Sequence, residues 1–306
     1  MKSNQNKPFM MNSISELHRI LELPKPEHPL ISVINFEKIK CYSDQALESV
    51  SYNFYCVALK KGFEGKMKYG RNYYDFDEGV MTFFAPNQIV STEIVSDLKL
   101  SGWWLVVHPD FLINYPLSKS IKEYGYFSYA VNEALHLSEK EEIAVTAIME
   151  TLTQEYHTAI DKFSQDVMIA QIELLLAYCN RFYNRQFITR KNVGNDLLKN
   201  MENIIQDYIK ADNLQLMGIL SVDYLANELN VTPHYLSDML RQLTGLNTQQ
   251  HIHSKIIEYA KELLASTELT VGEIAFKLGF EYSQSFNKLF KNKTNQSPIE
   301  YRNSLN

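Results

Sequence analysis

Apolar residues between 221 and 243 recur with helical spacing on either side of one short turn. Ser221 can cap the first helix, and Asn230 tolerates the left-handed backbone that ends a helix. Thr232 followed by Pro233 is typical of the start of a second helix. Two short helices across a tight turn predict a helix-turn-helix, whose second helix can enter a DNA major groove. The predicted apolar faces consist of Val222, Leu225, Ala226 and Leu229, then Tyr235, Leu236, Met239, Leu240 and Leu243.

The same order of signals returns between residues 270 and 290. Thr270 and Glu273 have the spacing of a capping box, and Gly279 supplies a helix stop. Ser283 is expected to cap the last helix of the pair. The apolar faces of this second copy consist of Val271, Ile274, Ala275 and Leu278, then Phe286, Leu289 and Phe290. Because caps, apolar face and helix stop occur twice in one order, a helical hairpin without a DNA-binding role explains the pattern poorly.

One longer amphipathic segment, from about Thr248 to Ser266, joins the two copies. Its apolar stripe consists of Ile252, Ile256, Ala260, Leu263 and Leu264. At 1.5 Å per residue this segment predicts a helical rod of about 27 Å. Such a rod can hold two reading helices about one DNA turn, or about 34 Å, apart.

The second copy resembles the signature of AraC/XylS-type transcriptional regulators. The resemblance is carried by Ile274-Ala275-x-x-Leu278-Gly279-Phe280, Ser283-x-x-Phe286-x-x-x-Phe290-Lys291 and Ser297-Pro298-x-x-Tyr301-Arg302. It covers about a third of the chain and implies two helix-turn-helix units on a linker helix. Two positions depart mildly from the family pattern: Asn295 stands where glycine is usual, and Lys255 where arginine is frequent.

The resemblance implies DNA-contacting positions on both second helices. In the first unit they are Thr232, His234, Ser237, Asp238 and Arg241; in the second they are Ser283, Gln284, Ser285, Asn287 and Lys288. Asp238 is a departure, because phosphates repel a carboxylate even though it can accept a hydrogen bond from cytosine. The second unit is therefore expected to read bases more than the first.

The pattern changes upstream of the helical region. Residues 1–27 are expected to form an arm, either flexible or folded over the next domain, and residues 28–137 carry short apolar runs typical of strands. Residues 138–185 predict helices, 186–196 a linker, and 197–306 the DNA-binding domain. The predicted fold is an α+β multidomain protein, in which the resemblance implies a cupin-like sensor barrel and a helical dimerisation segment before the all-α domain.

Charge and cysteine content narrow the class of protein. The formal net charge is −6, and residues 196–306 hold ten Lys or Arg against thirteen Asp or Glu. Cations gather from Ser283 onward, and a further cluster just before the domain consists of Arg181, Arg185, Arg190 and Lys191. We therefore expect local basic patches, modest non-specific affinity for DNA and a need for dimerisation or base contacts. Three scattered cysteines suit a reducing compartment, and no apolar run predicts a signal peptide or membrane span. A cytoplasmic protein is expected.

The strand-rich region lacks the residue patterns of an enzyme site. Its histidines are widely separated, no P-loop, dinucleotide fingerprint or nucleophile elbow occurs, and we expect no metal, cofactor or catalytic residue. An effector pocket is the alternative use of this region, with Arg71, Tyr73, Trp103 and Trp104 as candidate lining residues. Aromatic side chains that only fill the core remain an open explanation.

The sequence-based hypothesis is a non-enzymatic, sequence-specific regulator of transcription that binds double-stranded DNA. The further partners expected are a second copy of the chain, a small-molecule effector of unidentified chemistry, and RNA polymerase, but no membrane. Two alternatives stay open. One is a cupin-like enzyme with a DNA-binding tail, and the other is a ligand-independent regulator whose barrel is a protein-interaction module.

Overall fold

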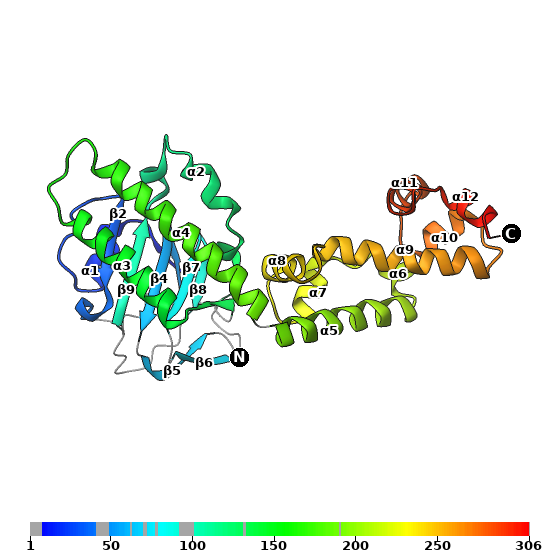
Figure 1. Ribbon diagram of the computed structural model, residues 1–306, viewed down its shortest axis with the longest axis horizontal. Helices are drawn as coiled ribbons and strands as arrows, with labels where there is room; N and C mark the ends of the chain where they lie inside the picture. The colour runs from blue at the N-terminus through cyan, green and yellow to red at the C-terminus, as the bar shows by residue number, and fades with distance from the viewer. Residues whose placement is uncertain are drawn as a thin grey trace, which may run out of the picture. The chain divides into compact units, whose positions relative to one another are not determined.

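The computed structural model describes residues 8–40, 49–61, 63–69, 72–76, 79–91, 101–130, 133–189 and 191–305, with backbone alone at 63–69, 72–76, 91, 189 and 191–193 (Figure 1). The chain divides into two compact units, Met1–Gln186 and Phe187–Asn306. The described strands all lie in the first unit, and the second is helical. No helix within these described ranges is long and apolar enough to cross a membrane.

The N-terminal unit contains ten described strands and several short helices. The strands are β1 (Phe9–Met11), β2 (Ile31–Asn35), β3 (Ser49–Tyr52), β4 (Tyr55–Lys61), β5 (Phe63–Tyr69), β6 (Asn72–Phe76), β7 (Val80–Phe84), β8 (Ile89–Ser91), β9 (Ser101–Val107) and β10 (Leu135–His136). The helices are α1 (Ile14–Ile20), η1 (Phe36–Lys38), η3 (Pro109–Leu112), α2 (Leu117–Ser120), η4 (Ile121–Glu123), η5 (Gly125–Ser128), α3 (Glu139–Tyr156) and α4 (Ser164–Thr189).

A five-stranded antiparallel sheet, in the order β10-β7-β4-β9-β2, forms the centre of this unit. One face of the sheet packs into the main core, to which β4 contributes Cys56 and Ala58. Helices α3 and α4 lie across the other face (Figure 1), where Cys179 Sγ of α4 is 3.7 Å from Met81 Sδ of β7. Side chains that alternate along each strand therefore serve two separate layers.

The N-terminal arm is part of the core. Strand β1 pairs in parallel with β3, and Ile14 and Leu17 of α1 are fully buried against the strands. Of the two states expected for residues 1–27, the described part thus adopts the folded one. The remaining described strands form a three-stranded sheet, β1-β3-β8, and a β5-β6 hairpin, and among the described strands no closed barrel is found.

The region expected to be a linker is largely helical. Helix α4 runs on to Thr189 and α5 begins at Lys191, so most of residues 186–196 lies inside these two helices. Tertiary contacts explain the difference: the buried Gln186 side chain accepts from the His136 N–H at 2.8 Å and donates to the Ala134 carbonyl at 3.1 Å. Because these hydrogen bonds hold Gln186 in place, α4 continues past residue 185, where the polar sequence predicts the helical segment to end.

The C-terminal unit contains two helix-turn-helix pairs joined by one long helix. Its helices are α5 (Lys191–Lys210), α6 (Asn213–Met217), α7 (Val222–Glu228), α8 (Pro233–Thr244), α9 (Thr248–Ser266), α10 (Val271–Lys277), α11 (Ser283–Thr294) and α12 (Pro298–Asn303). The pairs are α7–α8 and α10–α11. The linker helix α9 has the predicted bounds, its predicted stripe is buried, and it packs against α8, α10, α11 and α12.

The predicted helix signals are present at both pairs. Ser221 Oγ accepts from the Tyr224 N–H at 3.1 Å, Thr232 Oγ1 accepts from the Tyr235 N–H at 3.3 Å, and Thr270 forms the capping box with Glu273. Backbone φ is positive at Asn230 (56°), Gly279 (81°) and Asn295 (60°). Asparagine at 295 thus occupies the left-handed position for which glycine is the usual residue.

Candidate DNA-binding surface

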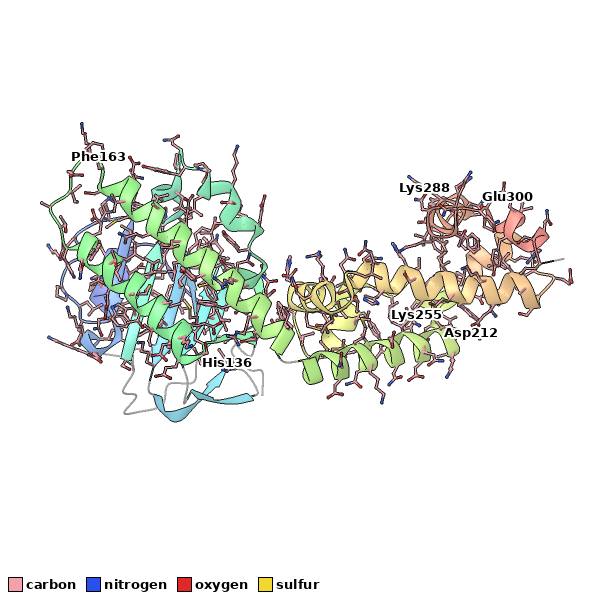
Figure 2. The ribbon with its side chains drawn as sticks, in the orientation of Figure 1. His136, Phe163, Asp212, Lys255, Lys288 and Glu300 are labelled. Atoms are coloured by element: carbon pink, nitrogen blue, oxygen red, sulfur yellow. The ribbon has the colours of Figure 1, made fainter. Side chains whose placement is uncertain are left out.

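Helix α11 presents a polar line above an aromatic base. Phe286 and Phe290 are fully buried, with ring centroids 5.7 Å apart, and Phe290 also contacts Tyr301 of α12. Because these anchors occupy one side of the helix, the residues between them project outward. Ser283, Gln284, Ser285, Asn287 and Lys288 are all exposed. Figure 2 shows Lys288 projecting from α11 on the side away from α9.

The start of α11 differs from the sequence-based expectation. Tyr282, not Ser283, is the N-cap, and no side chain caps the helix there. Ser283 is the first helical residue and is exposed. The Ser285 N–H donates to the Tyr282 carbonyl at 3.1 Å, so a backbone group takes part of the role of a side-chain cap.

Two of the predicted DNA-contacting hydroxyl groups at α8 form hydrogen bonds within the C-terminal unit. The Thr232 hydroxyl serves as the N-cap, and Ser237 Oγ lies 3.0 Å from Thr248 Oγ1 of α9. The cap at Thr232 was predicted from the sequence, whereas the contact of Ser237 with Thr248 was not. His234 is exposed at the start of the helix.

Asp238 and Arg241 form an ion pair within α8. The Arg241 Nη1 to Asp238 Oδ1 distance is 3.0 Å, and the side chains are 32% (Asp238) and 55% (Arg241) exposed. The pair lowers the positive potential that Arg241 alone would present to a phosphate. The structure therefore gives α8 a weaker electrostatic footprint than α11.

Sequence reasoning missed the electrostatic effect of Lys293, at the end of α11, on two histidines of the linker helix. His251 and His253 of α9 are half-buried, and Lys293 at the end of α11 acts electrostatically on both. Burial is the main cause that lowers the pKa of each histidine, and Lys293 lowers both further. His251 Nε2 lies 2.8 Å from Thr244 Oγ1, whereas His253 Nε2 lies 2.8 Å from Gln249 Nε2, so the two rings have separate partners.

Arg302, a residue of the signature, has a structural partner. Its Nε donates to the Leu264 carbonyl at 3.2 Å and ties α12 to the end of α9. Another cation counted from the sequence, Lys255, lies 3.0 Å from Glu258. The cations on α11 itself are Lys288, Lys291 and Lys293.

Of the four candidate effector residues, the structure describes the side chains of Trp103 and Trp104, which lie on opposite faces of β9. Arg71 and the side chain of Tyr73 lie outside the described residues. Trp104 packs in the core, 6.0 Å from Phe36 between ring centroids, whereas Trp103 faces the opposite side of β9 and borders a cavity. Adjacent strand residues point to opposite faces, so the two tryptophans do not share a pocket. Within the described ranges, no three His, Cys, Asp or Glu side chains are grouped as metal ligands.

Sequence comparisons match the C-terminal unit to helix-turn-helix proteins. Residues 225–304 match a family model described as a helix-turn-helix domain. The HTH-type transcriptional regulator YijO of Escherichia coli K12 is 32% identical over 98 residues, which cover 32% of this chain and 34% of that protein. The Msm operon regulatory protein of Streptococcus mutans is 25% identical over 157 residues, covering 51% and 54%. The solved C-terminal domain of the response regulator YesN from Fusobacterium nucleatum is 32% identical, with 34% and 98% coverage and a TM-score of 0.29.

Two adjacent helix-turn-helix pairs on one linker helix define the class of the C-terminal unit. The family match and the sequence relatives place that unit among the AraC-type helix-turn-helix domains of transcriptional regulators. The matched segment spans about a third of the first relative and about half of the second.

Proposed function

We propose that this chain is a sequence-specific DNA-binding regulator of transcription. The observation that carries the proposal is the set of exposed polar residues on α11, beside the buried rings of Phe286 and Phe290. These polar residues are Gln284, Ser285, Asn287 and Lys288. Amide, hydroxyl and ammonium groups at the start of a reading helix are the groups that bind base edges and phosphates. Helix α11 is assigned to base reading, and α8 to contacts with bases or the backbone.

The linker helix supports reading at two places on one duplex. Helix α9 has 19 residues, which corresponds to a length of about 28 Å. Helix α8 packs against α9 with Ser237 Oγ 3.0 Å from Thr248 Oγ1 at the start of α9, and α11 also packs against α9. Two recognition helices on one rigid rod are matched to major-groove segments about one turn apart.

A double substitution, Gln284→Ala with Lys288→Ala, tests the assignment of α11. Both side chains are exposed, so the unit keeps its fold while base and phosphate contacts are lost. We expect specific DNA retention to fall about tenfold or more. Selection from a randomised DNA pool at two salt concentrations, followed by sequencing, measures the change.

Lys210→Ala provides the charge control, because it removes one exposed cation from α5 and leaves α11 intact. This variant should enrich the same motif as the unmodified protein. Enrichment of two base blocks about one helical turn apart is expected for that protein. An unchanged motif and affinity in the double variant would overturn the assignment of α11.

We also propose that α4 pairs two copies of the chain. Exposed residues follow one line along this helix at intervals of four and three, the spacing of a coiled-coil seam: Phe163, Val167, Ala170, Leu174, Ala177 and Arg181. Phe163, Val167 and Leu174 are 57%, 39% and 48% exposed, although the opposite side of α4 already supplies the core with Ile172, Leu175 and Cys179. Phe163 directly precedes the first residue of α4, and Figure 2 labels it at that end of the helix. A second copy offers the same apolar seam and would cover it.

The N-terminal unit is proposed to sense a small molecule and to bias how the DNA-binding units are presented. Such an effector must bind one arrangement more tightly than the other. The proposal also keeps a cupin-like fold for this unit, because residues of the three-stranded and the five-stranded sheet share one core. RNA polymerase is the further partner proposed for a regulator bound at a promoter.

A further inference from the structure

A cavity of about 210 Å³ lies along the outer edge of β2 in the N-terminal unit. Ser32, Val33, Ile34 and Asn35 all border it. Consecutive strand residues point to opposite faces, so a cavity that touches four of them runs along the strand edge. Strand β2 is the last in the order of the five-stranded sheet, and no described strand pairs with its outer side. That edge offers backbone N–H and C=O groups to whatever fills the cavity.

The floor of the cavity is a fixed pair of buried polar side chains. His18 Nδ1 lies 2.6 Å from the Pro24 carbonyl, so this nitrogen carries the hydrogen, and Nε2 accepts from Ser32 Oγ at 2.8 Å. Burial lowers the pKa of His18, in agreement with a neutral ring. Both ring nitrogens of His18 have hydrogen-bond partners, and one of these partners is the Ser32 hydroxyl. The floor is therefore preorganised and carries no net charge.

The rim of the cavity is cationic. Lys25 and Lys38 are exposed lining residues, and neither forms an ion pair with another residue in the described ranges. Glu27, the acidic residue of the lining, already has its carboxylate 2.5 Å from His157 Nδ1. Two ammonium groups that have no ion-pair partner among the described residues, above a neutral floor, attract an anion.

The side walls are apolar and partly aromatic. Val33 and Ile34 are buried, Trp103 is half-buried, and Tyr156 closes the end at α3. A polar ion alone would leave these walls against water. A ligand with an apolar body and one charged end matches both the walls and the rim. A cavity of this size, between the ~150 Å³ that holds benzene and the ~300 Å³ of larger ligand sites, suits about ten to thirteen non-hydrogen atoms.

We propose that this cavity binds a small organic anion, a compact carboxylate with a flat apolar body, and that this anion is the effector of the regulator. The second part rests on the proposed function. The apolar body lies against Trp103 and the β2 edge, and the carboxylate meets Lys25 and Lys38.

The position of the cavity connects it to the seam of α4. Thr153 and Tyr156 at the C-terminal end of α3, with the C-cap His157, border the cavity. Near the other end of the same helix, Glu141 accepts two hydrogen bonds from Arg185 of α4, at 3.0 and 2.5 Å. An anion that shifts α3 therefore acts on the helix that carries the exposed apolar line.

Tryptophan fluorescence of the full-length chain tests the ligand class directly. The chain has two tryptophans, so Trp104→Phe leaves Trp103, at the cavity, as the single emitter. Phenylacetate is the probe, and phenylacetamide is its uncharged match of the same shape. We expect saturable change of Trp103 emission with phenylacetate, and binding of phenylacetamide weaker by about tenfold or more.

A rim variant, Lys25→Gln with Lys38→Gln, separates charge recognition from simple apolar filling. It should weaken phenylacetate about tenfold and leave phenylacetamide unchanged. Both residues are exposed, so an unaltered thermal transition is the control for folding. Equal binding of the acid and the amide, unchanged phenylacetate binding in the variant, or no saturable signal up to ~10 mM of phenylacetate would each overturn the proposal.

Failure of this proposal is distinct from failure of the proposed function. The rim variant lies in the N-terminal unit, and its DNA retention without probe should equal that of the unmodified chain. Loss of probe binding with intact DNA retention leaves the regulator assignment standing. Probe binding by a chain that enriches no DNA motif would keep the anion site and remove its role as an effector site.

Discussion

Individual side chains decide how strongly each reading helix can contact DNA. On α8 the Ser237 hydroxyl pairs with Thr248, and Arg241 pairs with Asp238. On α11 the corresponding polar groups are exposed above buried rings. The two helices share one fold, yet their capacity for base contact differs because neighbouring residues satisfy one set of polar groups and leave the other set in solvent.

Asp238→Asn tests the role of the carboxylate on α8. Removal of the negative charge frees Arg241 for a phosphate and removes repulsion, so affinity for DNA of any sequence should rise. The slope of log affinity against log salt should steepen by about 1. Fluorescence anisotropy with specific and random duplexes measures both quantities.

Arg241→Ala is the matched comparison, because it breaks the same ion pair and removes the cation instead. It should weaken binding to both duplexes to a similar degree. If Asp238→Asn weakens the specific duplex alone, the carboxylate reads a base and the repulsion argument is wrong.

Helix ends, more than helix interiors, fix the geometry of the second helix-turn-helix. Gly279 ends the α10 segment with φ of 81°, and a Cβ there would lie 2.5 Å from the Leu214 carbonyl oxygen of α6. Gly245 has a similar φ of 79° after α8, but nothing lies within 4 Å of its Cβ position. The glycine at 279 thus serves both a left-handed turn and a close approach of α6.

Alanine at these two glycines separates the two requirements. Gly245→Ala carries the left-handed cost alone, about 1–2 kcal/mol of unfolding free energy. Gly279→Ala adds overpacking against backbone, about another 1–3 kcal/mol. Urea denaturation followed by circular dichroism measures both, and equal losses would show that the approach of α6 imposes no extra constraint.

The number of DNA-binding units in the assembled regulator depends on whether α4 pairs two copies of the chain. Its core side anchors the N-terminal unit through Leu175, Leu176 and Cys179, while Val167 and Leu174 face solvent. Dimerisation doubles the number of DNA contacts, which suits a chain whose C-terminal region has a net negative charge.

Leu174→Glu places a charge in the middle of the proposed seam. Because Leu174 is 48% exposed, the unit should keep its fold while the seam loses its apolar match. Sedimentation velocity should show a dimer for the unmodified chain and a monomer for this variant.

Ile299→Glu supplies the control, since Ile299 is 60% exposed on α12, away from α4 in sequence and outside the N-terminal unit. This variant should sediment as the unmodified chain does. Monomer in the unmodified chain, at concentrations where it retains DNA, contradicts the pairing of α4.

The starts and ends of the C-terminal helices were predictable because the interactions that fix them are local. The caps at Ser221, Thr232 and Thr270 link atoms within three residues, and Asn230 and Gly279 express backbone preferences of single residues. The buried stripe of α9 likewise follows from helical periodicity alone. These signals, together with the family signature, predicted the C-terminal architecture and the exposed line of α11.

Contacts between distant residues determined the remainder. Ser237 meets Thr248 eleven positions away, and Arg302 meets the carbonyl of Leu264 across 38 positions. The opposite directions of Trp103 and Trp104, the burial of α1 and the cavity beside β2 all depend on which strands pair. Local chemistry along the chain specifies where helices start and stop, whereas strand order and packing specify which side chains share a core, a cavity or solvent.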